Sequence, residues 1–406
     1  MDFNLSQEEE LFRRSVVEFT ERYVKPNWAL VDDGKYPLIN IVRRMSESGL
    51  LGVPFDSRYG GQDGTFTMSA LATEELAYAD PSLATPVFYL LNTAWPFIVQ
   101  RYGREEVKEE ALPRVIKGVG FIGIASTEPQ GGSDVASTRL EARRSNGAWS
   151  LYGEKNIVTG VSLVVSDMDY GGFVTIARTA PIETRHRGLT SLLALVKSDG
   201  KVLSGFEYGS YEDIGRRGLV TNYIRFNGLT VKEPYTLGEV NGGFKVLMEG
   251  FDIARVLIAA ASVGVTRWLL DQSRDWIKSR VVFDKPIASY QSISFKYAEL
   301  AAKLEQARLL TYKAAWLTDK YFILNDSSVN VLTVATFNAM AKMTAVELAV
   351  ETALEAMRWF GGASYFKESN IARALLGALS YYVGAEGTGN IMRLIVARNL
   401  IGREVT

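Results

Sequence analysis

The chain has no cysteine, and its 406 residues include a single histidine, His186. Without cysteine it can form neither a disulfide nor a thiolate metal site, and it has no thiol nucleophile. One histidine argues against a zinc centre and against a histidine-dependent triad. His186 lies in a polar run, so we interpret it as a solvated loop residue, and we predict no metal site. If the protein moves protons, a carboxylate is the group expected to do so.

The sequence also lacks an excess of charge and any long apolar run. It carries 45 lysines and arginines against 46 aspartates and glutamates, a net charge of −1, whereas a general nucleic-acid binder is normally basic. No segment approaches ~18 uninterrupted apolar residues, so we predict no membrane span. The first residues have neither the basic nor the apolar region of a secretory signal. We therefore expect a cytoplasmic enzyme that has neither nucleic acid nor a membrane as partner.

The patterns along the chain change twice, which predicts three domains. Residues 1–119 have helical spacing and begin with a capping box of Ser6 and Glu9. Short β-rich runs separated by Gly, Asn and Asp turns fill 120–232. Long helical segments return over 233–406. We predict a mainly α protein with an all-β middle domain. A doubly wound sheet is not expected, because strands and helices do not alternate.

Glu386 lies among glycines in 384–389, directly before a helical pattern over 391–401. A lone carboxylate at a helix start is most often an N-cap acceptor, and this is the ordinary interpretation of such a residue. In a chain with one histidine it is also a well-placed general base. The motif alone leaves both hypotheses open.

A second stretch, 126–134, follows the apolar strand predicted over 121–125 and is rich in small residues. Its backbone N–H groups and the hydroxyls of Thr127 and Ser133 can hydrogen-bond the edge of a planar polar ligand. A Pro/Gly turn between two strands is the plainer alternative. The chain has no GxGxxG fingerprint, so any dinucleotide must be bound in some other way.

Several charged residues have both a structural and a functional interpretation. Arg280, near a helix end, either interacts with the helix dipole or grips a phosphate. Asp252 and Arg255 lie one helical turn apart, a spacing that an ordinary surface ion pair explains most often. Arg216 and Arg217 are interpreted as part of a turn, with a nucleotide phosphate as the alternative partner.

Taken together and in order, these stretches resemble the acyl-CoA dehydrogenase family of flavoproteins, and the resemblance covers almost the whole chain. Each motif is weak alone, but the ordered set is highly specific. The motifs are 58–61 (Arg-Tyr-Gly-Gly), 127–129 (Thr-Glu-Pro) with 132–134, 153–155 with Thr159, Gly238 with 243–244, 251–255, 280–283 with Gln291, 361–362, 386–388 and 393–398. The family fold has N-terminal α-helices, a β-barrel-like middle domain and a C-terminal four-helix bundle.

The resemblance implies FAD as cofactor and the α,β-dehydrogenation of an acyl-CoA thioester to a trans-2-enoyl-CoA. Glu386 matches the glutamate that removes the α-proton, while the β-hydrogen passes as hydride to flavin N5. Some members place that base just before the arginine that matches Arg255; here that position is Ala254, which cannot act. The Glu386 N–H and a ribityl hydroxyl of FAD would stabilise charge on the thioester oxygen. Burial would raise the pKa of Glu386.

By the same resemblance, two sets of residues would bind FAD. The flavin would lie against Ile124, Ala125, Ser126, Thr127, Gly132, Ser133, Ile157, Val158 and Thr159. Its phosphates and adenine would be bound by Arg280, Phe283, Gln291, Arg358, Gly361, Gly362, Thr388 and Asn390. Several of these would come from a neighbouring subunit, which implies a homotetramer or at least a dimer. The acyl-CoA would contact Ser133, Asp252, Arg255 and Gly387, and an electron-transfer flavoprotein would accept the electrons.

The chain departs from the family pattern at a few positions. Ile157 replaces a tryptophan, Asp284 a glycine and Arg358 a glutamine, and 384–385 replace residues that are often aromatic, which leaves the acyl-chain length open. An acyl-CoA oxidase, which passes electrons to oxygen, is the nearest alternative. A flavin-dependent monooxygenase or nitroalkane oxidase would generally lack the glutamate. A non-catalytic helical scaffold would bind no flavin.

Overall fold

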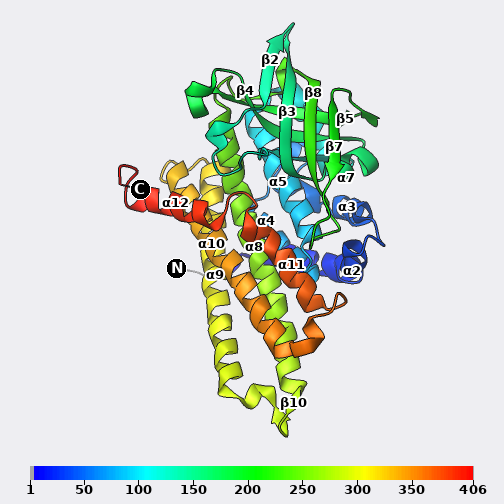
Figure 1. The fold of residues 1–406 in the computed structure, drawn as a ribbon, viewed down its shortest axis with the longest axis vertical. Helices are drawn as coiled ribbons and strands as arrows, with labels where there is room; N and C mark the ends of the chain where they lie inside the picture. The colour runs from blue at the N-terminus through cyan, green and yellow to red at the C-terminus, as the bar shows by residue number, and fades with distance from the viewer. Residues whose placement is uncertain (1–3, 406) are drawn as a thin grey trace.

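The computed structural model describes residues 4–405 and has helical segments at both ends of the chain with a mixed sheet between them. In Figure 1 the sheet lies at the upper end of the molecule, and the long C-terminal helices extend away from it towards the lower end. The predicted arrangement of a mainly α protein with a β-rich middle is confirmed in this outline.

The N-terminal segment is helical, as predicted. Its helices are α1 (Gln7–Phe19), α2 (Trp28–Asp32), α3 (Leu38–Glu47), α4 (Phe66–Ala79), α5 (Ala84–Tyr102) and α6 (Glu105–Ile116). The predicted capping box begins α1: the Glu9 N–H donates to Ser6 Oγ at 3.2 Å, and the Ser6 N–H to Glu9 Oε2 at 2.7 Å. Most of α5 is buried, because it contacts both the sheet and the first long C-terminal helix.

The middle segment is a mixed sheet. Its strands are β1 (Gly120–Ala125), β2 (Glu141–Ser145), β3 (Ala148–Thr159), β4 (Tyr170–Arg178), β5 (Leu189–Ser198), β6 (Lys201–Val202), β7 (Phe206–Ser210), β8 (Thr221–Lys232) and β9 (Thr236–Leu237). Their order is β6-β5-β4-β2-β3-β8-β7, with β1 parallel to β4 and β9 paired to β5. A short helix, α7 (Val161–Asp167), follows β3. The expectation of an all-β middle was therefore too strict, because 161–167 forms two helical turns.

The C-terminal segment consists of long helices around a buried one. They are α8 (Gly243–Ser279), α9 (Gln291–Phe322), α10 (Val331–Phe360), α11 (Asn370–Val383) and α12 (Gly389–Leu400), with the small hairpin β10 (Val281–Val282) and β11 (Lys285–Pro286) between α8 and α9. α8 packs against α4, α5, α9 and α10, and its residues 252–266 are all buried. It therefore links the N-terminal helices, the sheet and the C-terminal helices.

None of the helices between residues 4 and 405 combines the length and the apolarity that a bilayer crossing needs. In the same part of the chain, no cluster of His, Cys, Asp and Glu side chains is arranged to hold a metal ion.

Candidate active site

A cavity of about 660 Å³ lies where α5, α8, the sheet and the turn between α11 and α12 meet. It brings together motifs that the sequence analysis could only treat one by one. The predicted site residues that line it are Ile124, Ser126, Thr127, Gly132, Ser133, Ile157, Thr159, Arg255, Glu386, Gly387 and Thr388. The predicted residues Ala125 and Val158 are buried in the sheet beside it, at 0% and 1% exposure, and Asp252 does not line it.

Glu386 lies in the turn between α11 and α12 with a φ of 48°, and its side chain lines the cavity. The N-cap of α12 is Thr388, whose side chain accepts a hydrogen bond from the Ile391 N–H at 3.3 Å. The N-cap interpretation of Glu386 is therefore wrong. Gly387 follows with a φ of 106°, a conformation that favours glycine. Two left-handed residues in succession reverse the chain and turn the carboxylate towards the cavity.

Two buried cations hold this turn through its backbone. Lys342 of α10 donates through Nζ to the carbonyl oxygen of Ala385, at 2.5 Å, and to that of Gly387. Arg255 of α8 donates through Nε to the carbonyl oxygen of Glu386 at 3.0 Å. Three successive carbonyls therefore accept hydrogen bonds from cations.

Arg255 is itself fixed by Asp252, whose Oδ1 accepts from Nη1 at 2.7 Å. Both residues are 3% exposed, so the interpretation of this pair as an ordinary surface ion pair is wrong. Burial raises the pKa of Asp252 to about 6, against the opposing charge of Arg255. The Asp252 carboxylate keeps the guanidinium oriented towards the turn that contains Glu386.

The site raises the pKa of Glu386 above the ordinary value of 4.5 because the carboxyl group is buried. The positive charges of Lys342, Arg255 and Arg216 oppose this shift. Burial, together with the charge of Arg255, also lowers the pKa of Lys342 to about 8, although Glu386 acts in the other direction. A carboxylate with a raised pKa is a better proton acceptor than an exposed one.

A buried ion pair between Lys155 and Glu128 holds the 126–134 turn in place. Lys155 and Glu128 are 0% and 4% exposed, and Lys155 Nζ donates to Glu128 Oε1 at 2.7 Å and to the Ser126 carbonyl at 2.9 Å. The backbone N–H groups of Arg139 and Leu140 also donate to Glu128, at 2.8 and 2.9 Å. Burial alone would raise the pKa of Glu128, but the charge of Lys155 and these donors lower it. The pair fixes the strand end that carries Thr127.

Ile157 lies on β3 where the register with β8 shifts between Lys155 and Val158. Its φ is 55° and its side chain is 67% exposed on the cavity wall. A β-branched residue in the left-handed region is strained, and such strain is found at functional sites. The bulge turns the Ile157 side chain out of the sheet, next to Thr159 of the same strand.

Apart from Thr388, the residues predicted for the far end of FAD do not line this cavity. Arg280 ends α8, Phe283 is the turn of the β10–β11 hairpin, and Gln291 begins α9. In Figure 1 the β10 hairpin lies at the lower end of the long helices, away from the sheet. Phe283 is 86% exposed. Arg358, Gly361 and Gly362 lie near this group. The Trp276 ring stacks on Phe360, with ring centroids 4.5 Å apart, and the Arg280 guanidinium lies over the Trp276 ring at 6.0 Å.

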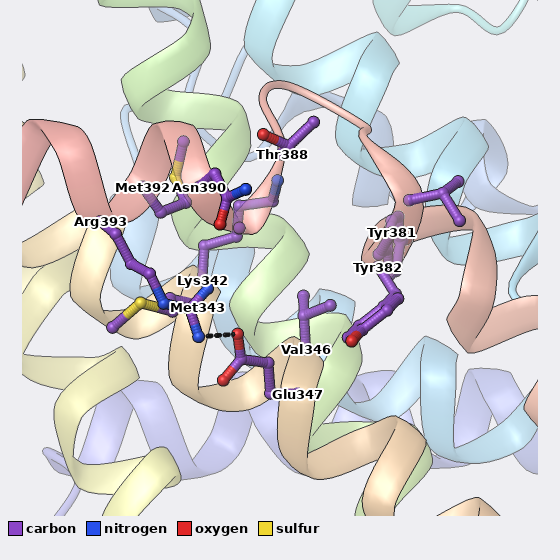
Figure 2. A pocket seen from close by; sticks show the side chains of 12 residues that line it. Lys342, Met343, Val346, Glu347, Tyr381, Tyr382, Thr388, Asn390, Met392 and Arg393 are labelled. Carbon is purple, nitrogen blue, oxygen red and sulfur yellow. Dashed lines mark hydrogen bonds and ion pairs between the residues drawn. The ribbon is translucent and has the colours of Figure 1, made fainter.

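Asn390 lines a second, smaller cavity of about 330 Å³, together with Lys342, Tyr381, Thr388 and Arg393. Figure 2 shows its lining side chains, with the Arg393–Glu347 ion pair closing one side. Thr388 and Tyr381 line both cavities. The two cavities therefore lie next to each other, at the start of α12 and the end of α11.

Sequence reasoning gave no site role to Lys342 or Lys155, and it did not place Arg216 in the cavity. Lys342 has a signal that could have been used, since its neighbours on the same helical face include the apolar Ala339, Ala345 and Val346. Arg216 was interpreted as part of a turn, and the backbone does turn there. The side chains of Arg216 and Arg217 nevertheless point to different places. Arg217 binds Asp32 and Asp33, whereas Arg216 lines the cavity.

Comparisons with known proteins find the same family along almost the whole chain. Residues 6–119, 123–229 and 241–401 match the models of the acyl-CoA dehydrogenase N-terminal, middle and C-terminal domains. Two Bacillus subtilis proteins are similar: an acyl-CoA dehydrogenase (31% identity, 98% of this chain and 99% of that protein) and the probable acyl-CoA dehydrogenase YngJ (30%, 99% and 100%). The structure of butyryl-CoA dehydrogenase from Megasphaera elsdenii superposes with a TM-score of 0.87 at 27% identity, over 99% of this chain and 100% of that one.

Proposed function

The chain belongs to the acyl-CoA dehydrogenase family, and from this premise we propose that it oxidises an acyl-CoA thioester to the trans-2-enoyl-CoA, with Glu386 as the base. Members of the family are FAD-dependent oxidoreductases that act on CH–CH donors, so the predicted family, enzyme class and cofactor are confirmed at that level. We keep the predicted domains 1–119, 120–232 and 233–406 as the units of this proposal.

The observation that carries the proposal is the placement of the Glu386 carboxylate. It lines a cavity with largely apolar walls, opposite a sheet edge rich in hydroxyls, and burial raises its pKa. Both properties favour a base for an α-proton: the carboxylate has access to the substrate carbon, and its raised pKa makes it a stronger proton acceptor. In this proposal Glu386 takes the α-proton and holds it as the neutral acid.

The backbone around Glu386 is arranged to stabilise the charge that develops on the thioester oxygen. The carbonyls of 385–387 all accept from Lys342 or Arg255. Among the described residues the Glu386 N–H has no hydrogen-bond acceptor, so it is available as a donor. A fixed N–H aimed at an oxygen that becomes negative lowers the barrier without reorganisation. We propose that Lys342 and Arg255 act as positioning residues for this N–H.

The residues present fit a flavin. Thr127, Ser133 and Thr159 place hydroxyls at the cavity wall, and none of the three hydroxyls is used in a hydrogen bond within residues 4–405. Hydroxyls that no other group of the chain occupies are available to hydrogen-bond the polar edge of a planar ligand. FAD, when bound, supplies the acceptor for the β-hydrogen. Ile124, Ile157 and the 126–133 turn would hold it next to Glu386.

We further propose that two copies of the chain complete each FAD site, in a homotetramer or at least a dimer. The group around Arg280 lies at the other end of the long helices from the catalytic cavity, so one chain would hold two half-sites. Large exposed apolar residues near that group, among them Phe283, Tyr365 and Phe366, are 86%, 85% and 62% exposed. Side chains of this kind are common at subunit contacts. An electron-transfer flavoprotein as acceptor remains part of the proposal.

The purified protein tests the proposal directly. We expect a yellow protein with flavin absorption bands that are bleached anaerobically by at least one member of a panel of straight, branched and dicarboxylic acyl-CoAs. A protein that takes up no flavin on reconstitution would support the scaffold alternative. Bound flavin that no acyl-CoA bleaches would contradict the proposed reaction. Turnover that yields peroxide in air, without need of a dye or flavoprotein acceptor, would identify an oxidase.

A further inference from the structure

Arg216 enters the catalytic cavity from the loop between β7 and β8. Its side chain is buried, with 7% of the residue exposed, and its φ is 56°. A positive φ is uncommon for a residue with a long side chain and is retained where the surroundings require it. This arginine therefore differs from Arg217, which points away from the cavity to Asp32 and Asp33.

The guanidinium of Arg216 has an unused donor. Nη2 donates to Thr221 Oγ1 at 2.9 Å, but Nη1 is buried and has no hydrogen-bond partner in residues 4–405. No carboxylate of that part of the chain lies within ion-pair distance of Arg216. The nearest candidate in sequence, Asp213, uses Oδ2 to accept from the Thr221 N–H at 2.8 Å. A buried charge without a partner is costly, so a partner from outside the chain is expected to complete it.

A second orphaned donor lies on the same wall. Tyr381 of α11 is 3% exposed and lines the cavity, and its hydroxyl also has no partner among the described residues. Tyr381 and Arg216 come from different elements and interact electrostatically. The neighbouring wall, Val87, Leu90 and Leu91 of α5, is apolar. Two unpaired donors therefore stand in a cavity that otherwise suits a hydrocarbon chain.

We propose that Arg216 and Tyr381 form a subsite for a carboxylate on the acyl group, so that the substrate is the CoA thioester of a dicarboxylic acid. This inference rests on the proposed function, since it assigns the far end of the acyl chain in the same cavity. A guanidinium offers a planar fork that matches a carboxylate, and a phenol adds one further donor. A purely hydrocarbon acyl group would leave both donors unsatisfied and would bind poorly.

Besides Tyr381, Arg216 interacts electrostatically with two carboxylates, Asp213 and Glu386, and the second of them gives a competing role. The charges of Glu386 and the guanidinium interact, and in the competing role Arg216 serves only as a counter-charge for the base. The two roles differ in which substrates they affect. A subsite changes the preference between acyl groups, whereas a counter-charge changes the oxidation of every acyl-CoA to the same extent.

The experiment compares dicarboxylic acyl-CoAs of four to eight carbons with straight-chain acyl-CoAs of the same carbon count, in the flavin-loaded enzyme. We expect the best dicarboxylic substrate to exceed its straight-chain match in kcat/KM by roughly 10- to 100-fold, as for a hydrogen-bonded charged group. Arg216→Met should abolish that ratio when both substrates are measured at a pH above the acid limb, where the loss of a positive charge near Glu386 affects the two substrate classes equally. Arg225→Met, which removes an exposed arginine of β8, is the matched control and should keep the ratio.

Tyr381→Phe removes a single hydroxyl, so it tests the subsite even if Arg216→Met fails to fold, and it should reduce the ratio by roughly 3- to 10-fold. Binding is measured separately, as the perturbation of the flavin spectrum by the dicarboxylic 2-enoyl-CoA. Equal loss with both substrate classes in Arg216→Met, or an unchanged ratio in both variants, would overturn the subsite. If no acyl-CoA bleaches the flavin at all, the proposed function fails instead.

Discussion

Lys342 lies beneath Glu386 and donates hydrogen bonds to the two peptide carbonyls on either side of it. The proposed base is thus held through its backbone by a buried cation, while its carboxylate stays at the cavity wall. Lys342 therefore acts on Glu386 in two ways. The backbone contacts fix where the carboxylate is, and the charge of Lys342 acts on the pKa of Glu386.

Glu386→Gln should leave flavin binding intact and lower turnover by roughly 10²- to 10⁴-fold, the contribution of a positioned general base. Glutamine has nearly the same shape and keeps the turn, but it cannot accept the α-proton. The measurement is the rate of anaerobic flavin bleaching by the best acyl-CoA, with the flavin content of each preparation as control. Near-normal bleaching in this variant would remove Glu386 from the mechanism.

The acid limb of the kcat/KM profile should lie above pH 4.5. The pKa of Glu386 is raised in the folded protein, and only the ionised carboxylate accepts a proton, so activity falls as the pH is lowered through that raised pKa. The profile is measured with the best acyl-CoA across the acidic range. A limb at or below the ordinary glutamate value would mean that burial does not act on the base as the structure indicates.

Lys342→Met should move this acid limb to higher pH and lower kcat by roughly 10- to 100-fold. The shift follows because a positive charge that lowers the pKa of Glu386 is lost, and the lower kcat because the turn loses two hydrogen bonds and the base is misplaced. Lys303→Met, which removes an exposed ion pair with Glu351, is the control. A purely structural lysine would lower the amount of folded enzyme without moving the limb.

Lys155→Met should lower the free energy of unfolding by about 3–5 kcal/mol, because it leaves the Glu128 carboxylate buried without its cation. Denaturant unfolding at neutral pH measures the change. The same variant should also retain flavin poorly, because Lys155 binds the Ser126 carbonyl at the cavity wall. Since the pKa of Glu128 is lowered on folding, its contribution to stability is present above pH 4.5 and is lost as the pH falls through the lowered pKa.

The control for this variant is Arg225→Met, which breaks the exposed pair with Glu154. It should change the free energy of unfolding by only about 0–1 kcal/mol. Equal effects of the two substitutions would mean that the Lys155–Glu128 pair contributes no more than a surface ion pair.

Arg280→Ala should weaken FAD binding by roughly 10- to 100-fold, the loss expected for hydrogen bonds to a charged phosphate, and spare the bleaching rate of the flavin that remains. A mixed oligomer tests whether Arg280 acts on a neighbouring copy. In Arg280→Ala co-expressed with Glu386→Gln, an active site with an intact base receives Arg280 from the other chain, so activity should return. No recovery in such mixtures would place Arg280 at the FAD of its own chain.

The order of helical and β-rich segments could be predicted from the sequence, because spacing of three and four residues and the alternation of short β runs are local properties. The capping box of Ser6 and Glu9 is of the same kind, since both partners lie within one turn. One histidine and no cysteine also predicted that the base is a carboxylate, whereas the choice of Glu386 among 46 acidic residues rested on the family resemblance.

Only the tertiary structure decided the contacts between residues that are far apart in the chain. Lys342 is 43 residues from Ala385, and no local pattern relates a lysine of one helix to the carbonyls of a later turn. The same holds for Asp252 and Arg255, whose spacing is that of a surface pair but which are buried where α8 packs against its neighbours. Arg216 and Arg217 are adjacent in sequence, yet one ends in the cavity and the other at α2. Burial and partner are properties of packing, so for these residues the sequence supplied the chemical group and the fold supplied its environment.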